Sequence, residues 1–377
     1  MLALVTGLRG RVKARGPGHV AVGPLASPLH HAATAVLLLA CCLLVCVRQY
    51  FGQPVHCLLD VMGDDSAVNE HVLNTYCFVA ATYTVLPEEG GRGLGQPHAG
   101  VGPDWWRGKQ LPRRRHAYYQ WVPLALFLQF LSFRAPHLAW ERWEGGLVRA
   151  SLGGLAGARP LLLGAQERHQ LLRRLAGYFE ARRGSHRYWA AGYLACDLLQ
   201  LLNVAANLLL TDVLLGGTFA GYGLQVVKFL QLHPEDGRYD AIDAVFPKVT
   251  KCTFYKYGPS GSLQNLDALC VMALNVVNEK IYTALWFWLL PLAAVSAAAL
   301  LWRLVVAGAL VRGRTGWAAR LTAPGLPAWA ARRLDLGDWL YLHLLLRNMD
   351  PALRPEFQEQ LAAARADGEA GPVIADC

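Results

Sequence analysis

Four cysteines lie in two of the three mainly polar segments that separate the long apolar stretches of the chain. Cys57 and Cys77 lie in the first segment with 19 residues between them, and Cys252 and Cys270 lie in the second with 17. An even set of cysteines in segments outside the cytoplasm is typical of disulfides, whereas zinc sites normally use more closely spaced ligand pairs. The spacing therefore predicts disulfide chemistry and no metal centre.

Four cysteines allow three pairings, and pairing within each segment remains open on spacing alone. The distance of each cysteine from the nearest apolar stretch favours pairing across the two segments. Cys57 follows the first apolar stretch closely and Cys270 precedes the last one closely, so both should lie near the membrane surface. Cys77 and Cys252 lie further along their segments. Two cysteines at the same distance from the membrane surface can bring their Cα atoms within the roughly 7 Å that a disulfide requires.

A second set of polar residues lies inside the third apolar stretch: Asp197, Gln200, Asn203, Asn207 and Thr211. At about 100° per residue they occupy one helical face, within an arc of roughly 120°. Such a face borders either a water-filled path or a neighbouring helix. We favour hydrogen bonding between helices, because one polar face among four apolar helices is common packing chemistry.

Motifs for catalysis or cofactor binding are absent from the sequence. It has no HExxH zinc motif, no nucleophile elbow, no P-loop and no paired carboxylates within an apolar stretch. We therefore predict no catalytic residue, no cofactor and no enzyme activity.

Four apolar helices must position these residues. Hydrophobic residues make up 54% of the 377 residues and charged residues 17%, fewer charges than the roughly one quarter usual in soluble domains. A bilayer core of about 30 Å requires roughly 20 helical residues. Four stretches are long enough, and we predict transmembrane segments at 29–47, 117–140, 193–215 and 281–309.

Basic residues near the spans predict the orientation, since they gather on the cytoplasmic side. The N-terminal segment 1–28 contains four basic residues and no acid: Arg9, Arg11, Lys13 and Arg15. The loop 141–192 contains nine arginines against four glutamates. Both of these segments and the tail 310–377 should be cytoplasmic, and segments 48–116 and 216–280 should be extracellular loops. Three consecutive arginines, Arg113 to Arg115, run against this rule.

Two further patterns predict local structure. Aromatic residues near the ends of the second and fourth spans predict belts at both membrane surfaces rather than internal packing: Tyr118, Tyr119, Trp121, Trp140, Trp143, Tyr282, Trp286, Trp288 and Trp302. Leucine-rich runs at 171–179 and 339–346 predict two cytoplasmic helices whose apolar faces are covered by a helical layer.

The start of the second span carries a recognisable motif: Tyr118, Tyr119, Gln120, Trp121 and Val122. Other motifs follow in order along the chain, and they are Arg48 to Gly52, Trp140 to Gly146, Phe246 to Cys252, Asn278 to Tyr282 and Asn348 to Pro351. Over residues 29–355 the sequence resembles the innexins, the subunits of invertebrate gap-junction channels.

The resemblance implies an all-α membrane protein, a four-transmembrane-helix large-pore channel subunit. Such a subunit has a small disulfide-linked α+β extracellular domain and a helical cytoplasmic domain. The resemblance also implies the crossed pairs Cys57 with Cys270 and Cys77 with Cys252. It further implies a ring of eight, built with itself or with other innexin-like subunits in the plasma membrane at gap junctions. That ring would dock onto a ring in the neighbouring cell and pass ions and small metabolites between the cells. Membrane lipid is then an expected partner and nucleic acid is not.

The basic N-terminal residues Arg9, Arg11, Lys13 and Arg15 depart from the family, whose first residues are usually more apolar and acidic. They are candidates for a positively charged pore mouth, because every subunit would repeat them around the ring. Alternatively, the segment is disordered and only follows the charge distribution across the membrane. Two other functions remain open: an undocked, pannexin-like hemichannel that releases solutes, and a tetraspan adhesion scaffold that conducts nothing.

Overall fold

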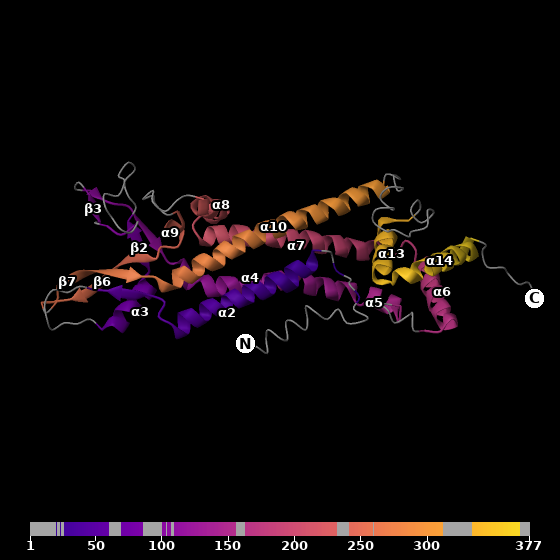
Figure 1. Ribbon diagram of the computed structural model, residues 1–377, viewed down its shortest axis with the longest axis horizontal. Coiled ribbons are helices and arrows are strands. Elements are labelled where there is room, and N and C mark those ends of the chain that lie inside the picture. Colours follow the sequence, from indigo (N-terminus) through magenta and orange to yellow (C-terminus); the bar gives the residue numbers. More distant parts are fainter. Residues whose placement is uncertain are drawn as a thin grey trace, which may run out of the picture. The chain divides into compact units, whose positions relative to one another are not determined.

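A computed structural model describes residues 20, 23, 26–59, 69–85, 100–102, 104–106, 109–155, 163–231, 241–258, 260–311 and 334–369. Four of its helices are long and apolar enough to cross a membrane: Leu29–Phe51, Val122–Glu144, Arg187–Leu214 and Ala273–Ala309. They are α2 (Ala35–Phe51), which follows the π-helical turn η1 (Leu29–Thr34), then α4 (Val122–Glu144), α7 (Arg187–Leu214) and α10 (Ala273–Val311) (Figure 1). The structure thus has four long apolar helices in the order expected from the sequence.

The ends of these helices differ from the apolar stretches. α7 begins at Arg187 and α10 at Ala273, before the predicted spans, because a helix can continue into polar sequence that hydropathy does not detect. α4 begins later than the predicted span, at Val122, after a 3₁₀ turn, η2 (Tyr118–Gln120). Pro123 suits the first turn of α4, where an amide hydrogen has no intrahelical partner.

The chain forms two compact units. The sheet unit comprises Leu29–Arg134 and Leu202–Ala294, and the helical unit comprises Met1–Pro28, Ala135–Leu201 and Val295–Cys377. The sheet unit therefore contains the four cysteines of the polar segments, and the helical unit contains the two leucine-rich runs.

The sheet unit is built on a five-stranded antiparallel sheet in the order β1–β7–β6–β2–β5. Its strands are β1 (His56–Leu58), β2 (Thr82–Val85), β5 (Arg113–His116), β6 (Val249–Tyr257) and β7 (Leu263–Val271). A separate pair, β3 (Trp105–Trp106) with β4 (Lys109–Gln110), precedes β5. Both polar segments contribute to one sheet, since β1 pairs with β7 and β2 pairs with β6.

One face of this sheet is covered by α3 (Glu70–Ala80). Side chains alternate between the two faces of a strand, and alternation places Ala268 and Cys270 of β7 together in the core. α3 packs against β1 and β6 with Leu73 and Cys77 buried. Its first turn is capped by Asn69, whose side chain accepts a hydrogen bond from the backbone amide of His71.

An aromatic cluster lies where the sheet unit meets its helices. The ring centroid of Phe246, just after α9 (Ala241–Val245), lies 5.7 Å from Tyr118 and 5.6 Å from Tyr282. It also lies 5.6 Å from Tyr222 of α8 (Phe219–Gln231). Tyr119 is also fully buried.

The prediction of aromatic belts is therefore wrong for several residues, because position along a helix does not reveal which face a side chain occupies. Tyr119 is 0%, Tyr282 1% and Trp140 3% exposed, and all three pack inside the protein. Trp143 and Trp302 are 62% and 46% exposed, as a belt requires.

The helical unit contains the short helices that flank the spans. They are α5 (Leu147–Leu152), α6 (Ala165–Ala181), α13 (Leu336–Asn348), η5 (Pro351–Leu353) and α14 (Arg354–Glu369). α14 packs along α6, and Arg168 Nε lies 3.0 Å from Glu356 Oε2 between them. Phe179 of α6 and Tyr341 of α13 are fully buried in one apolar cluster, so the two leucine-rich runs share a core. α13 is buried on nearly every side rather than along one stripe.

Candidate functional site

The four cysteines of the sheet unit lie at disulfide distance in two pairs. The sulfur atoms of Cys57 and Cys270 are 2.03 Å apart, and those of Cys77 and Cys252 are 2.02 Å apart. Cys57 lies opposite Cys270 in the β1–β7 ladder. Cys252 lies on β6 and its partner Cys77 on α3. Each pair therefore joins the first polar segment to the second.

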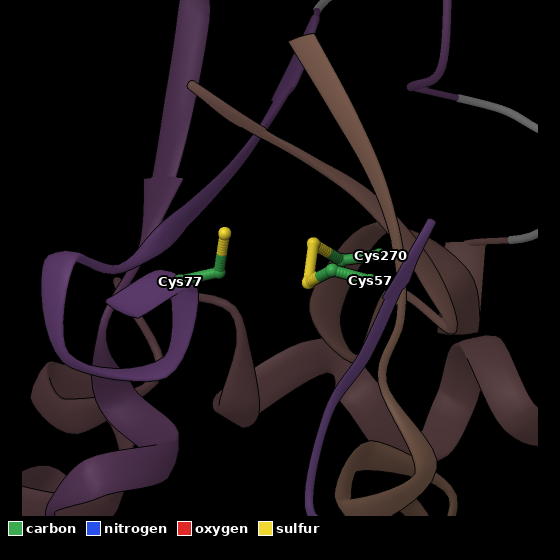
Figure 2. Close-up of side chains that lie close together, drawn as sticks. All are labelled: Cys57, Cys77 and Cys270. Carbon is green, nitrogen blue, oxygen red and sulfur yellow. A yellow bond between two sulfur atoms is a disulfide. The ribbon is translucent and has the colours of Figure 1, made fainter. Parts of the chain in front are cut away.

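The two pairs are neighbours, and Figure 2 shows the sulfur of Cys77 close to the bonded sulfurs of Cys57 and Cys270. These three sulfur atoms lie within 4.8 Å of one another, a spacing at which three thiolates could hold a soft metal ion. Paired as they are in the structure, they provide no thiolate. The arrangement therefore favours disulfides over a metal centre.

The motif before α4 binds the C-terminal end of α3. Gln120 Nε2 donates hydrogen bonds to the carbonyl oxygens of Phe78, at 2.6 Å, and of Val79, at 3.2 Å. The hydroxyl of Tyr119 donates to the Phe78 carbonyl at 3.3 Å. The last carbonyls of a helix have no intrahelical partner, so the motif satisfies the groups that follow directly after Cys77.

The other three motif residues have different surroundings. Tyr118 packs edge-on against Phe246 in the aromatic cluster. Val122 is fully buried at the start of α4, whereas Trp121 is 58% exposed. The motif is thus mainly a packing element of the sheet unit, with one tryptophan directed outward.

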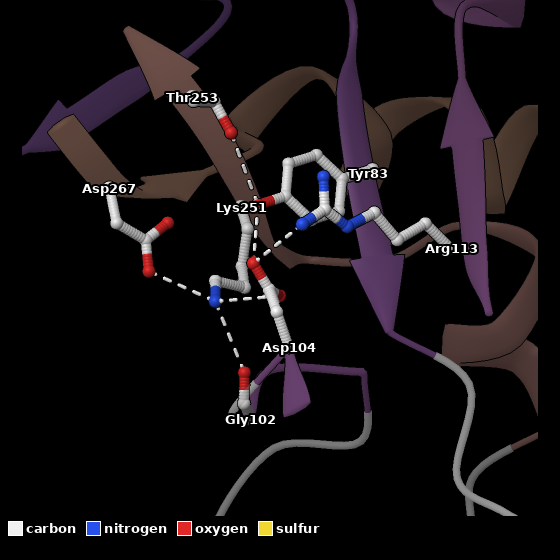
Figure 3. Close-up of polar contacts among 7 residues, drawn as sticks. All are labelled: Tyr83, Gly102, Asp104, Arg113, Lys251, Thr253 and Asp267. Carbon is white, nitrogen blue, oxygen red and sulfur yellow. Dashed lines mark hydrogen bonds and ion pairs between the residues drawn. The ribbon is translucent and has the colours of Figure 1, made fainter. Parts of the chain in front are cut away.

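A buried lysine joins strand β6 to the segment before β3 (Figure 3). Lys251 Nζ lies 3.1 Å from Asp104 Oδ1, 2.9 Å from Asp267 Oδ2 and 3.1 Å from the carbonyl oxygen of Gly102. Its side chain is 9% exposed. Burial opposes the lysine charge, but the hydrogen bonds and charges of Asp267 and Asp104 outweigh burial and raise the pKa of Lys251. The lysine therefore stays charged and holds Gly102 and Asp104 against the sheet.

The same aspartate also anchors strand β5. Arg113 Nη2 lies 3.0 Å from Asp104 Oδ2, and the Arg113 guanidinium lies 4.9 Å from the centre of the Tyr83 ring. We call Lys251, Asp104, Asp267, Arg113 and Tyr83 the ionic cluster. It adds a polar connection between the two segments that the cysteine pairs join.

His116, the last residue of β5, is 3% exposed and pairs with the neighbouring strand. Its Nε2 lies 2.8 Å from Thr84 Oγ1 on β2. Burial, and then the positive charge of Arg114, lowers the pKa of His116 to about 4. The imidazole is therefore neutral near pH 7.

Polar residues of α7 hydrogen-bond to α4 within the sheet unit. Gln129 Nε2 donates to Thr211 Oγ1 at 2.8 Å, and Asn207 Nδ2 donates to Ser132 Oγ at 3.0 Å. Asn207 also contacts Asn203 Oδ1 at 3.2 Å. These contacts agree with helix–helix hydrogen bonding as the role of this polar face.

Two contacts of the helical unit involve buried aspartates, Asp197 and Asp338. Asp197 of α7 forms a buried ion pair with Arg303 of α10. His186 Nδ1 lies 2.7 Å from Asp338 Oδ1, and both side chains are at most 4% exposed. Asp338 also accepts a hydrogen bond from the backbone amide of Gly184. The turn before α7 is thereby attached to α13.

Sequence reasoning anticipated some of these residues and missed others. The candidate pore-mouth residues Arg9, Arg11, Lys13 and Arg15 lie outside the residues that the structure describes. The ionic cluster and His116 were not anticipated, because no motif connects residues so distant in sequence. The three consecutive arginines of β5, which oppose the charge rule, were the one available signal.

Comparison with known proteins identifies the family. The Innexin family profile matches residues 25–364. The chain is 38% identical to Innexin inx3 of Drosophila melanogaster over 338 residues, which is 88% of this chain and 82% of that protein. It is 36% identical to Innexin inx2 of Schistocerca americana over 341 residues, covering 89% and 90% of the two chains. With Innexin shaking-B of Drosophila melanogaster it shares 34% over 372 residues, covering 96% and 94%. The chain therefore belongs to the innexin family.

Proposed function

We propose that this innexin is a structural subunit of gap junctions, forming oligomeric channels that pass ions and small metabolites between adjacent cells. Beyond family membership, one observation carries the proposal: segments 48–116 and 216–280 are joined into one sheet by two cysteine pairs and the ionic cluster. Ordering mobile loops on contact would reduce affinity. A surface that is rigid before contact therefore suits docking between two cells.

Electrical recording from paired cells tests this function. We expect conductance between two cells that both express the chain, and none between untransfected cells. Current through single cells alone would instead indicate an undocked hemichannel. Cell adhesion with neither current would indicate a scaffold.

The proposed topology places segments 48–116 and 216–280 outside the cell and both termini inside. The basic residues of 1–28 and 141–192 support it, as do cysteine pairs in the segments assigned to the oxidising side. We also propose a ring of eight subunits, on the family resemblance. Images of the purified oligomer would count the subunits, and protease or antibody access in intact cells would show which segments are outside.

We propose that the crossed cysteine pairs are formed at the cell surface and are needed for docking. Non-reducing peptide mapping of surface-labelled protein should find peptides joining Cys57 to Cys270 and Cys77 to Cys252. The substitution Cys57→Ser should abolish coupling, while Cys46→Ser, in α2, should preserve it. A peptide joining Cys57 to Cys77 would disprove the connectivity.

We also propose that Arg9, Arg11, Lys13 and Arg15 make the cytoplasmic pore mouth electropositive and favour anions. Replacement of all four by glutamine should shift the reversal potential in a salt gradient toward lower anion preference. An unchanged reversal potential would mean that these residues only follow the charge distribution across the membrane and do not act on the pore.

A further inference from the structure

The turn between α6 and α7, residues 182–186, contains a serine preceded by two arginines. Its sequence begins Arg182, Arg183, Gly184, Ser185, and no other serine or threonine of the chain has arginine at both the third and the second position before it. Ser185 is exposed, and its hydroxyl donates a hydrogen bond to the carbonyl oxygen of Arg182. Arginine-directed serine kinases select substrates by such a charge pattern, binding the guanidinium groups with carboxylates. The turn therefore joins this pattern to an accessible hydroxyl.

The two arginines can reach a kinase without disrupting the core. Arg182 is exposed and forms no ion pair with any residue that the structure describes. Arg183 Nη1 lies 3.7 Å from Glu180 Oε2, and a partly exposed pair at this distance contributes little to stability. Residues 182–186 belong to no helix or strand. A kinase can therefore extend the turn without unfolding α6 or α7.

Asp338 of α13 binds the residues on both sides of Ser185. Its Oδ2 accepts a hydrogen bond from the backbone amide of Gly184 at 2.7 Å, and its Oδ1 lies 2.7 Å from His186 Nδ1. Extending the turn withdraws Gly184 and His186 from this carboxylate. Phosphorylation of Ser185 is therefore coupled to the attachment of the turn to α13.

A phosphate on Ser185 would oppose that attachment once it was made. A phosphoserine carries a charge of about −1.5 to −2 near pH 7. It would repel the carboxylate of Asp338, which water screens poorly because the side chain is 1% exposed. It would also compete with Asp335 for Arg187, whose Nε lies 2.6 Å from Asp335 Oδ2. Both effects weaken the contact between the turn and α13.

We propose that an arginine-directed serine kinase phosphorylates Ser185 and that the phosphate releases the 182–186 turn from α13. The serine oxygen attacks the γ-phosphorus of ATP, and the bond from that phosphorus to the bridging oxygen breaks. ADP leaves, and the hydroxyl proton passes to the catalytic carboxylate of the kinase. The inference rests on the proposed cytoplasmic location of 141–192, because ATP and these kinases act in the cytoplasm.

Phosphorylation of the purified full-length channel tests the site. The protein in detergent is incubated with ATP and the catalytic subunit of cAMP-dependent protein kinase, and phosphopeptides are mapped by mass spectrometry. Wild-type protein should be phosphorylated at Ser185. Arg182→Gln should lower kcat/KM for this site about tenfold, the effect of losing one charge-assisted contact. Arg174→Gln removes the same charge from an exposed position of α6 and should change nothing.

Hydrogen exchange before and after phosphorylation tests the release. Peptides covering 184–190 and 335–342 should exchange about tenfold faster in the phosphorylated channel, as expected for loss of one hydrogen-bonded contact to a charged group. Ser185→Ala, treated with the same kinase and ATP, should exchange as it did before treatment.

Four results would each overturn the proposal. They are no phosphate at Ser185, an equal fall in rate for both arginine variants, unchanged exchange of 335–342 after phosphorylation, and faster exchange in treated Ser185→Ala. Neither readout needs channel activity, so failure of this proposal is distinct from failure of coupling between cells.

Discussion

Acidification should destabilise the five-stranded sheet through His116. This side chain is buried and bonded to Thr84, and its pKa is lowered to about 4 from 6.5. Because folding lowers the pKa, the unfolded state binds more protons below about pH 6.5. The stabilisation is therefore complete above that pH and is lost progressively as the pH falls toward about 4.

The magnitude follows from the two pKa values. At pH 5 the imidazole is mostly protonated in the unfolded state and mostly neutral in the folded state. The difference corresponds to about 2 kcal/mol of stability lost between pH 7.5 and pH 5. The equilibrium constant for opening of the β2–β5 pair should rise about thirtyfold over this range, since about 1.4 kcal/mol is a factor of ten.

Hydrogen exchange of peptides covering 82–85 and 113–116 measures this opening, after correction for the pH dependence of intrinsic exchange. His116→Gln keeps a donor near Thr84 but cannot be protonated, so its exchange should be nearly independent of pH. His71→Gln, at an exposed position of α3, should behave like the wild type. Equal pH dependence in wild type and His116→Gln would refute the reasoning.

Four further substitutions, the last with a matched control, test the contacts that stabilise the sheet unit. Lys251→Met should cost about 2 kcal/mol, seen as faster hydrogen exchange of residues 100–111, because Asp104 and Asp267 each lose a cationic partner and only Asp104 keeps another, Arg113. Asp267→Asn should cost under about 1 kcal/mol in the same assay, since that carboxylate is 61% exposed. Gln120→Ala should cost about 1–2 kcal/mol and speed exchange at the end of α3, because two helix carbonyls lose a donor. Gly223→Ala should lower the free energy of unfolding of the purified channel by about 1–3 kcal/mol, measured by thermal denaturation. The added Cβ would lie 2.1 Å from the ring of Trp286 in α10. Gly221→Ala, in the same helix with no atom within 4 Å, should be neutral or stabilising.

The spans were predictable because a membrane imposes a long apolar run on any helix that crosses it. Hydropathy could not show which way a side chain points. Tyr282 and Trp302 lie at opposite ends of the same apolar helix, yet the first is 1% and the second 46% exposed. Tyr282 packs against Phe219 and Phe246, from other segments of the chain, and hydropathy does not reveal these contacts.

The ionic cluster was beyond prediction for a different reason. Asp104 and Lys251 are separated by 147 positions. Asp104 lies in no motif, and the motif that contains Lys251, Phe246 to Cys252, does not indicate which residue the lysine contacts. Their meeting depends on β2 pairing with both β5 and β6. The cysteines were easier because thiols in such segments have few partners other than each other, so chemistry restricts the choice to three pairings.

The three arginines of β5 illustrate how a conflict with a general rule can point to local structure. Arg113 binds Asp104, while Arg114 and Arg115 donate to the backbone carbonyls of Ala244 and Ala80. These bonds explain why positive charge is kept on a segment that the charge rule would leave neutral.

Arg115 has the most consequential position of the three. Its carbonyl partner belongs to the last residue of α3, where the negative end of the helix dipole attracts a cation. The next residue, Ala81, has a φ of 71°, the only positive φ outside glycine among the described residues. Such a conformation costs a residue with a Cβ about 1–3 kcal/mol and persists only when its surroundings impose it. Arg115 on one side and Gln120 on the other hold the carbonyls just before this reversal. The arginine run and the aromatic motif therefore serve one purpose, which is to fix the end of α3 that carries Cys77.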